Sequence, residues 1–162
     1  LPDDIHVNRV EIVSSDFHAR FSVKKKTYEY LINTGEYDVF LKGYAYQCPY
    51  PLDVEKMKEG ASLFLGRHDF TSFNTSGLKE YPDQVRQISE FSIRKTGKML
   101  KITVTSTGFL RNMVRIMVGT LIDVGRGHKT LDDIRKMLEE PSKGTRRSNA
   151  DPNGLYLKKI FY

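Results

Sequence analysis

Arg115 is the residue whose surroundings fit its chemistry least. It stands in the run MVRIMV, residues 113–118, inside an apolar stretch that predicts a buried helix. A guanidinium is almost never fully buried unless it is paired, because removing its hydration is costly. Arg115 is therefore expected to reach a carboxylate, a phosphate or a cavity mouth, with Arg111 one turn earlier on a similar face. The alternative is that its long side chain extends to the surface over apolar neighbours.

Tyr28 lies in a second segment that suits a nucleic-acid ligand. In DFHARFSVKKKTYEY, residues 16–30, the basic residues Arg20, Lys24, Lys25 and Lys26 come just before Tyr28. Basic side chains hold a phosphate backbone, and an aromatic face stacks on an extruded base. A half-buried strand tyrosine and a solvated lysine turn would explain the same residues without a ligand. The residues alone leave both interpretations open.

Hydrophobic periodicity predicts the elements that position these residues. Strands are expected at residues 5–13, 27–34, 43–47, 86–107 (as a hairpin) and 155–162. Helices are expected at residues 53–66, 109–127 and 130–140. Residues 67–84 are rich in turn formers and are expected to form a long surface loop. The order predicts a single α+β domain over residues 1–162, with a mixed, mainly antiparallel sheet covered by helices on one face.

Local turn and cap residues sharpen three of these boundaries. Gly97 is expected to take the unusual backbone conformation of the hairpin turn. Asp53 is a natural N-cap for the first helix. Thr130 and Asp133 have the spacing of a capping box at the start of the third helix.

Composition favours a soluble, basic protein of a reducing compartment. Lys and Arg number 26 against 20 Asp and Glu in 162 residues, a net charge of +6, which suits a polyanionic partner but also fits a mildly basic protein without one. The single cysteine, Cys48, excludes an internal disulfide. The four histidines have no ligand spacing, so no metal is expected. No apolar run is long enough to span a membrane, and we expect a cytoplasmic location.

Several motifs in order give the chain a resemblance to a known family. They are LPDDI, DFHAR-FS, K-K-T-Y-E-Y, PLD with the helix after it, G-R-H-D-F-T-S-F, V-R-Q-I, GFLRNMVR with MVGTLIDVGRG, and GLYL. Together they span essentially the whole chain, and the sequence resembles the TruA-type tRNA pseudouridine synthases.

The resemblance implies a function and a set of partners. Enzymes of this family isomerise uridine to pseudouridine in tRNA without a cofactor, here with uridines of the anticodon arm as the implied targets. It further implies a homodimer as the full-length enzyme. Tyr28 matches the tyrosine that packs on the target uracil, and Arg115 matches the arginine that pairs with the catalytic aspartate. The basic residues Arg20, Lys24, Lys25, Lys26 and Arg111 are then expected to contact the RNA backbone.

One departure from the family pattern limits this expectation. The nucleophilic aspartate of the family belongs to a G-R-T-D-A-G-V-H motif upstream of LPDDI, and no such motif occurs in these residues. Asp69, in the similar G-R-H-D, belongs to the separate H-D-F-x-S-F segment and is not assigned as the nucleophile. We therefore expect the native protein to be longer at its N-terminus and this portion to be inactive alone. The alternative is a tRNA-binding module that natively lacks the nucleophile.

Overall fold

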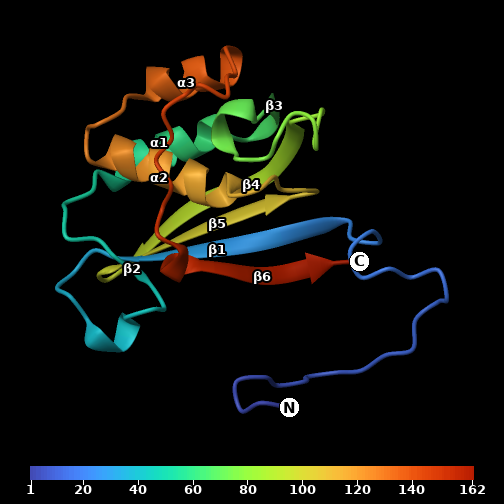
Figure 1. Ribbon diagram of the computed structural model, residues 1–162. Helices are drawn as coiled ribbons and strands as arrows, with labels where there is room; N and C mark the ends of the chain where they lie inside the picture. The colour runs from blue at the N-terminus through green and yellow to red at the C-terminus, as the bar shows by residue number, and fades with distance from the viewer.

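The computed structural model describes residues 1–162 and contains one six-stranded sheet with three α-helices on one face (Figure 1). The strands follow the order β2-β1-β5-β4-β3, and β6 also pairs with β1. Their bounds are β1 Lys25–Asn33, β2 Tyr46–Gln47, β3 Gly66–Asp69, β4 Val85–Thr96, β5 Met99–Ser106 and β6 Leu155–Phe161. Every pairing is antiparallel except that of β1 with β2. The expected α+β class with a mixed, mainly antiparallel sheet is confirmed.

The helices bury their apolar sides against the sheet. Their bounds are α1 Val54–Leu63, α2 Met113–Gly125 and α3 Leu131–Glu139. Alternate residues of β1, Tyr30 and Ile32, are fully buried in the core that α2 covers, as the period of two in a strand requires. Nearly every residue of α2 is buried, which confirms the expected buried helix, although it begins at Met113 and not at residue 109. None of the three helices is long and apolar enough to cross a bilayer.

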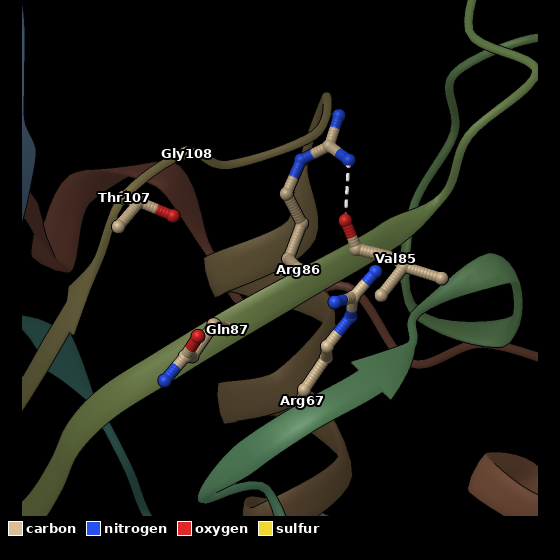
Figure 2. A pocket seen from close by; sticks show the side chains of 6 residues that line it. All are labelled: Arg67, Val85, Arg86, Gln87, Thr107 and Gly108. Atoms are coloured by element: carbon tan, nitrogen blue, oxygen red, sulfur yellow. Dashed lines mark hydrogen bonds between the residues drawn. The ribbon is translucent and has the colours of Figure 1, made fainter.

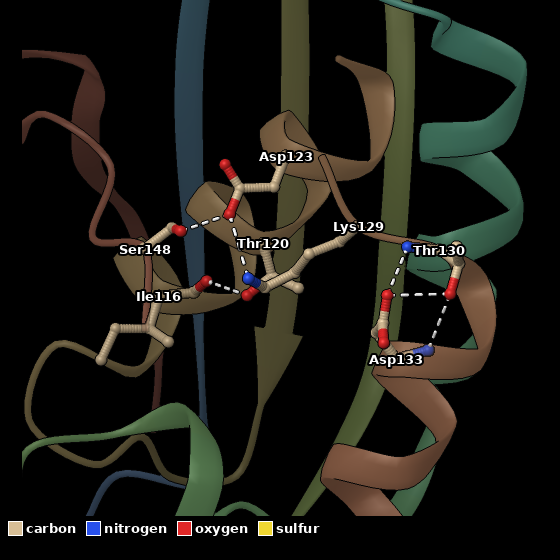
Figure 3. A network of polar contacts seen from close by, with 7 residues as sticks. All are labelled: Ile116, Thr120, Asp123, Lys129, Thr130, Asp133 and Ser148. Atoms are coloured by element: carbon tan, nitrogen blue, oxygen red, sulfur yellow. Dashed lines mark hydrogen bonds and ion pairs between the residues drawn. The ribbon is translucent and has the colours of Figure 1, made fainter. Parts of the chain in front are cut away.

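The three local predictions are confirmed. Gly97 has a φ of 58° in the turn between β4 and β5, a conformation that costs glycine little. The side chain of Asp53 accepts a hydrogen bond from the Lys56 N–H at the start of α1. Thr130 and Asp133 form a reciprocal capping box at the start of α3, which is visible in Figure 3.

The strand expected at residues 5–13 is absent. These residues pair with no other strand, and the apolar side chains of Val10 and Ile12 are exposed. Alternating hydrophobic residues favour a strand only where a neighbour completes its hydrogen bonds and covers its apolar face. Within the 162 residues no neighbour does so, which is why the local pattern was insufficient.

The prediction of a surface loop at residues 67–84 is also wrong over much of that range. Residues 66–69 form β3 at one edge of the sheet, and Phe70 and Phe73 after it are fully buried. Asn74 and Gln84 are buried too, and their side-chain oxygens each accept a hydrogen bond at 2.9 Å from Lys143 Nζ. Burial of these polar side chains is tolerated because they are hydrogen-bonded. The many turn-forming residues of this segment favoured a loop, and the prediction therefore missed two aromatic core residues.

Candidate active site

Tyr28 lines two neighbouring cavities. It lies on β1, opposite Val104 of β5 and Leu157 of β6. Its ring meets that of Phe109 edge to face, with centroids 5.1 Å apart and planes at 88°. This packing fixes the ring plane, while burial raises the pKa of the Tyr28 phenol above its ordinary value. The phenol is therefore neutral at physiological pH and offers a hydrogen-bond donor and an aromatic surface.

The two cavities share Tyr28, Phe109, Leu110 and Asn112 but differ in their remaining walls. The smaller cavity, here called the inner cavity, has a volume of about 110 Å³ and is also lined by Met113, Val114, Arg115 and Leu155. The larger cavity, here called the outer cavity, has a volume of about 400 Å³ and is also lined by Ser76, Glu80, Tyr81 and Arg111. The structure thus brings Tyr28 beside both arginines predicted from the sequence, one in each cavity.

Arg115 is partly buried and is held by groups that leave much of its guanidinium free. Its Nε donates to the Ala150 carbonyl oxygen at 2.8 Å, and its Nη1 lies 3.5 Å from Asn112 Oδ1. No ion pair with an aspartate or glutamate of residues 1–162 involves Arg115. The Arg115 side chain therefore brings a fixed positive charge to the inner cavity, as its burial in an apolar helix suggested.

Arg111 does not share a helical face with Arg115, contrary to expectation. The helix α2 begins at Met113, and Arg111 precedes it in a segment shaped by Asn112, whose φ is 59°. The Arg111 N–H donates to Ser76 Oγ at 3.0 Å, and its carbonyl oxygen accepts from the Thr75 N–H at 3.0 Å. The left-handed conformation of Asn112, uncommon for a residue other than glycine, separates the two arginines into the two cavities.

The lysine run is divided between the two faces of the sheet. Lys26 is on the same face of β1 as Tyr28, because side chains alternate along a strand. Lys25 is on the other face, with its Nζ 4.4 Å from the centre of the Phe161 ring. Lys24 is exposed, and Arg20 is exposed over the Phe21 ring in the turn before β1. Of these four basic residues, Lys26 alone is placed beside Tyr28 by strand position.

A segment that the sequence analysis missed holds Arg115 in place. Residues 148–151 lie along α2, where the Ala150 N–H donates to the Arg115 carbonyl at 3.0 Å. Ser148 Oγ donates to Asp123, whose carboxylate also lies 3.4 Å from Lys129 Nζ (Figure 3). At the other end, the Tyr30 hydroxyl donates to the Asp151 carbonyl at 2.6 Å. The Ala150 carbonyl that fixes the guanidinium is therefore itself fixed on both sides.

Gly119 permits this segment to approach α2. A Cβ at Gly119 would clash with the Ser148 carbonyl oxygen and lie 2.7 Å from its carbon and 3.0 Å from the Ala150 nitrogen. A glycine inside a helix weakens the helix, so its presence there indicates a close backbone approach. That signal was available in the sequence, although it does not identify the approaching segment.

We expect Gly119→Ala to destabilise the fold and loosen Arg115. Displacing residues 148–150 should lower the free energy of unfolding by about 1–3 kcal/mol, the usual cost of overpacking. Urea unfolding measures it, and Gly77→Ala is the matched control because nothing lies within 4 Å of a Cβ at Gly77. Equal stability of Gly119→Ala and Gly77→Ala would contradict the proposed close packing.

Comparison with known proteins gives this fold and site a family. A sequence profile described as tRNA pseudouridine synthase matches residues 61–162. The chain belongs to the tRNA pseudouridine synthase family, and the resemblance to the TruA type is confirmed. It is 45% identical over its whole length to tRNA pseudouridine synthase A of Bacillus licheniformis and 44% identical to that of Bacillus subtilis. The alignment covers 66% of each of these relatives, so the chain spans just under two thirds of their length.

No group of three or more His, Cys, Asp or Glu side chains has a geometry that could hold a metal ion.

Proposed function

We propose that the protein is a tRNA pseudouridine synthase that isomerises uridines in the anticodon arm. The observation that carries this proposal is that Tyr28 and Arg115, on different elements, line one cavity of about 110 Å³. The family membership supports the reaction class, and the names of the relatives support tRNA as the substrate. We further propose a cytoplasmic homodimer that works without a cofactor.

In the proposed reaction Tyr28 holds the target base. The C1′–N1 bond of the uridine breaks, the uracil turns, and a C1′–C5 bond forms, while C5 loses a proton and N1 gains one. The neutral phenol ring of Tyr28, held by Phe109, offers a surface on which the uracil can stack. An extruded base is read by such stacking in enzymes that act on nucleobases.

Arg115 is proposed to pair with the catalytic aspartate. A carboxylate that attacks the ribose or its base must be oriented and kept ionised, and a guanidinium does both through paired hydrogen bonds. Since Arg115 has no carboxylate partner in residues 1–162, we assign the aspartate to a part of the protein outside them. These residues would then supply base stacking and RNA binding and be inactive alone.

Backbone contacts are proposed for the basic residues around the site. Arg111 lines the outer cavity and Lys26 is on the same sheet face as Tyr28, which supports the proposal that both contact phosphates near the target nucleotide. Arg20, Lys24 and Lys25 are exposed farther along the same segment. Phosphate contacts of this kind position an RNA without reading its sequence.

The decisive experiment measures pseudouridine formation in an unmodified tRNA transcript. The complete gene product should form pseudouridine, and residues 1–162 alone should bind the tRNA without modifying it. Activity of residues 1–162 alone would contradict the assignment of the aspartate and make Asp69 a candidate for the nucleophile. Binding without activity in both proteins would favour a tRNA-binding module that lacks the nucleophile.

A further inference from the structure

A second basic site lies beside residues 107 and 108, which directly precede Phe109. Six residues line a pocket of about 350 Å³, here called the arginine pocket: Arg67, Val85, Arg86, Gln87, Thr107 and Gly108 (Figure 2). It contains two guanidinium groups and no carboxylate. Neither arginine forms an ion pair with an acidic residue of the chain. A concave site with two positive charges and no counter-charge favours an anion.

Arg86 is fixed in position before any ligand binds. It is partly buried on β4, and its Nη1 donates to the carbonyl oxygens of Val85 at 2.6 Å and Asp83 at 3.1 Å. Its Nε and Nη2 make no hydrogen bond within the chain and remain free to donate. A guanidinium fixed in this way loses less conformational entropy when it binds an anion.

Arg67 completes the pocket from the neighbouring strand. The register of β3 with β4 sets Arg67 opposite Gln87, next to the pair of His68 and Arg86. Figure 2 shows the Arg67 side chain reaching toward β4 near Val85, while Arg86 extends toward the segment that carries Gly108. The side chain of Arg67 is exposed and makes no hydrogen bond or ion pair within the chain, so an anion would be its first partner.

The rim of the pocket brings backbone close to Arg86. A Cβ at Gly108 would lie 3.6 Å from Arg86 Nε, so a larger side chain there would occupy the space beside the guanidinium. The Gly108 N–H donates to Ser106 Oγ at 3.2 Å, which fixes the turn after β5. Thr107 is exposed at the rim, and its hydroxyl has no partner within the chain. The pocket therefore adds a free hydroxyl to its two guanidinium groups.

We infer that the arginine pocket binds a phosphate of the RNA strand next to the nucleotide held at Tyr28. The two sites share one segment, because Thr107 and Gly108 line the arginine pocket while Phe109 and Leu110 line the cavities at Tyr28. Consecutive residues are about 3.8 Å apart, so one RNA strand can reach both sites. Guanidinium forks match the geometry of phosphate oxygens. This inference rests on the proposed function, since it takes RNA to be the substrate.

The test replaces each arginine in the complete gene product and measures tRNA binding against salt concentration. Arg67→Gln and Arg86→Gln should each raise Kd and KM for tRNA roughly tenfold, as expected for one charge-assisted hydrogen-bonded contact. Each should also reduce the slope of log K against log salt by about 0.7–0.9 per lost phosphate. The value of kcat should change little. Arg94→Gln is the control, because Arg94 is exposed on the same strand β4 and lines none of these cavities.

Arg67→Gln keeps the test informative if Arg86→Gln disturbs the fold, because the Arg67 side chain has no partner in the chain to lose. If Arg67→Gln and Arg94→Gln have the same salt slope and Kd, the inference is overturned. Competition with inorganic phosphate separates the sources of the anion. The inference is also overturned if Arg67→Gln abolishes the binding of inorganic phosphate but leaves the salt slope of tRNA binding unchanged. The pocket would then bind a free anion and not an RNA phosphate.

The binding measurement needs no turnover, so the two proposals can fail separately. If the wild-type protein forms no pseudouridine but Arg67→Gln reduces the salt dependence of tRNA binding, the proposed reaction is contradicted and the phosphate site is supported. If the wild-type protein forms pseudouridine and Arg67→Gln leaves tRNA binding unchanged, the reaction is supported and the phosphate site is contradicted.

Discussion

Replacing Tyr28 with Ala in the complete gene product should reduce pseudouridine formation by at least about 100-fold. The substitution removes the ring on which we propose the uracil stacks, and stacking on one aromatic side chain contributes about 1–3 kcal/mol. It also removes the only phenol of the inner cavity, and a positioned proton donor or acceptor contributes about 100-fold or more. The effect should fall on kcat. Affinity for tRNA should remain within a few-fold, because phosphate contacts supply most of it.

The measurement is single-turnover pseudouridine formation together with tRNA binding on the same samples. Tyr28→Phe keeps the ring and its edge contact with Phe109, so it tests the hydroxyl alone. Tyr37→Ala is the matched control for loss of a tyrosine, since Tyr37 is exposed and lies outside both cavities. A near-normal rate for Tyr28→Ala would remove Tyr28 from the active site.

Local chemistry made the secondary structure largely predictable. Turn and cap residues affect only the backbone a few residues away. All three that were predicted occur in the structure, at Gly97, Asp53 and Thr130. Residues 5–13 show the limit of the same reasoning, because their alternation specifies a strand but not its partner. Phe70 is the opposite case, since its place in the core depends on β4 and on contacts far along the chain.

The candidate site was predictable by residue type but not by arrangement. Arg115 was conspicuous as a charge in an apolar helix, and Tyr28 as an aromatic residue after a basic run. Their shared cavity depends on how α2 packs on β1, which no sequence spacing specifies. Arg67 and Arg86 were not identified, because only the folded arrangement of β3, β4 and the turn at Gly108 brings them into one pocket.

Residues 148–151 were missed for a related reason. Their sequence contains turn formers and a single alanine, and nothing in it indicates contact with α2. The contact exists because Gly119 leaves room for it and because Asp123 and Tyr30 hold its two ends. The support of the arginine is thus distributed over three distant segments, each ordinary by itself.

Arg115→Lys should show that this support matters for turnover. An ammonium cannot keep the hydrogen bond that Nε makes to the Ala150 carbonyl and also present two parallel donors to a carboxylate. We expect kcat and kcat/KM to fall together by at least about 100-fold, the sign of an interaction made in the transition state. Loss of the Ala150 hydrogen bond should lower the free energy of unfolding by only about 1 kcal/mol.

The control for Arg115→Lys is Arg126→Lys, at the end of the same helix. Arg126 is partly buried, and its Cζ lies 3.9 Å from the centre of the Tyr50 ring. Its replacement by lysine therefore also removes a packed guanidinium. Pseudouridine formation should be near normal in Arg126→Lys, although thermal unfolding should respond in both variants. A wild-type kcat in Arg115→Lys would mean that a positive charge suffices in the inner cavity and that paired hydrogen bonds to an aspartate play no part.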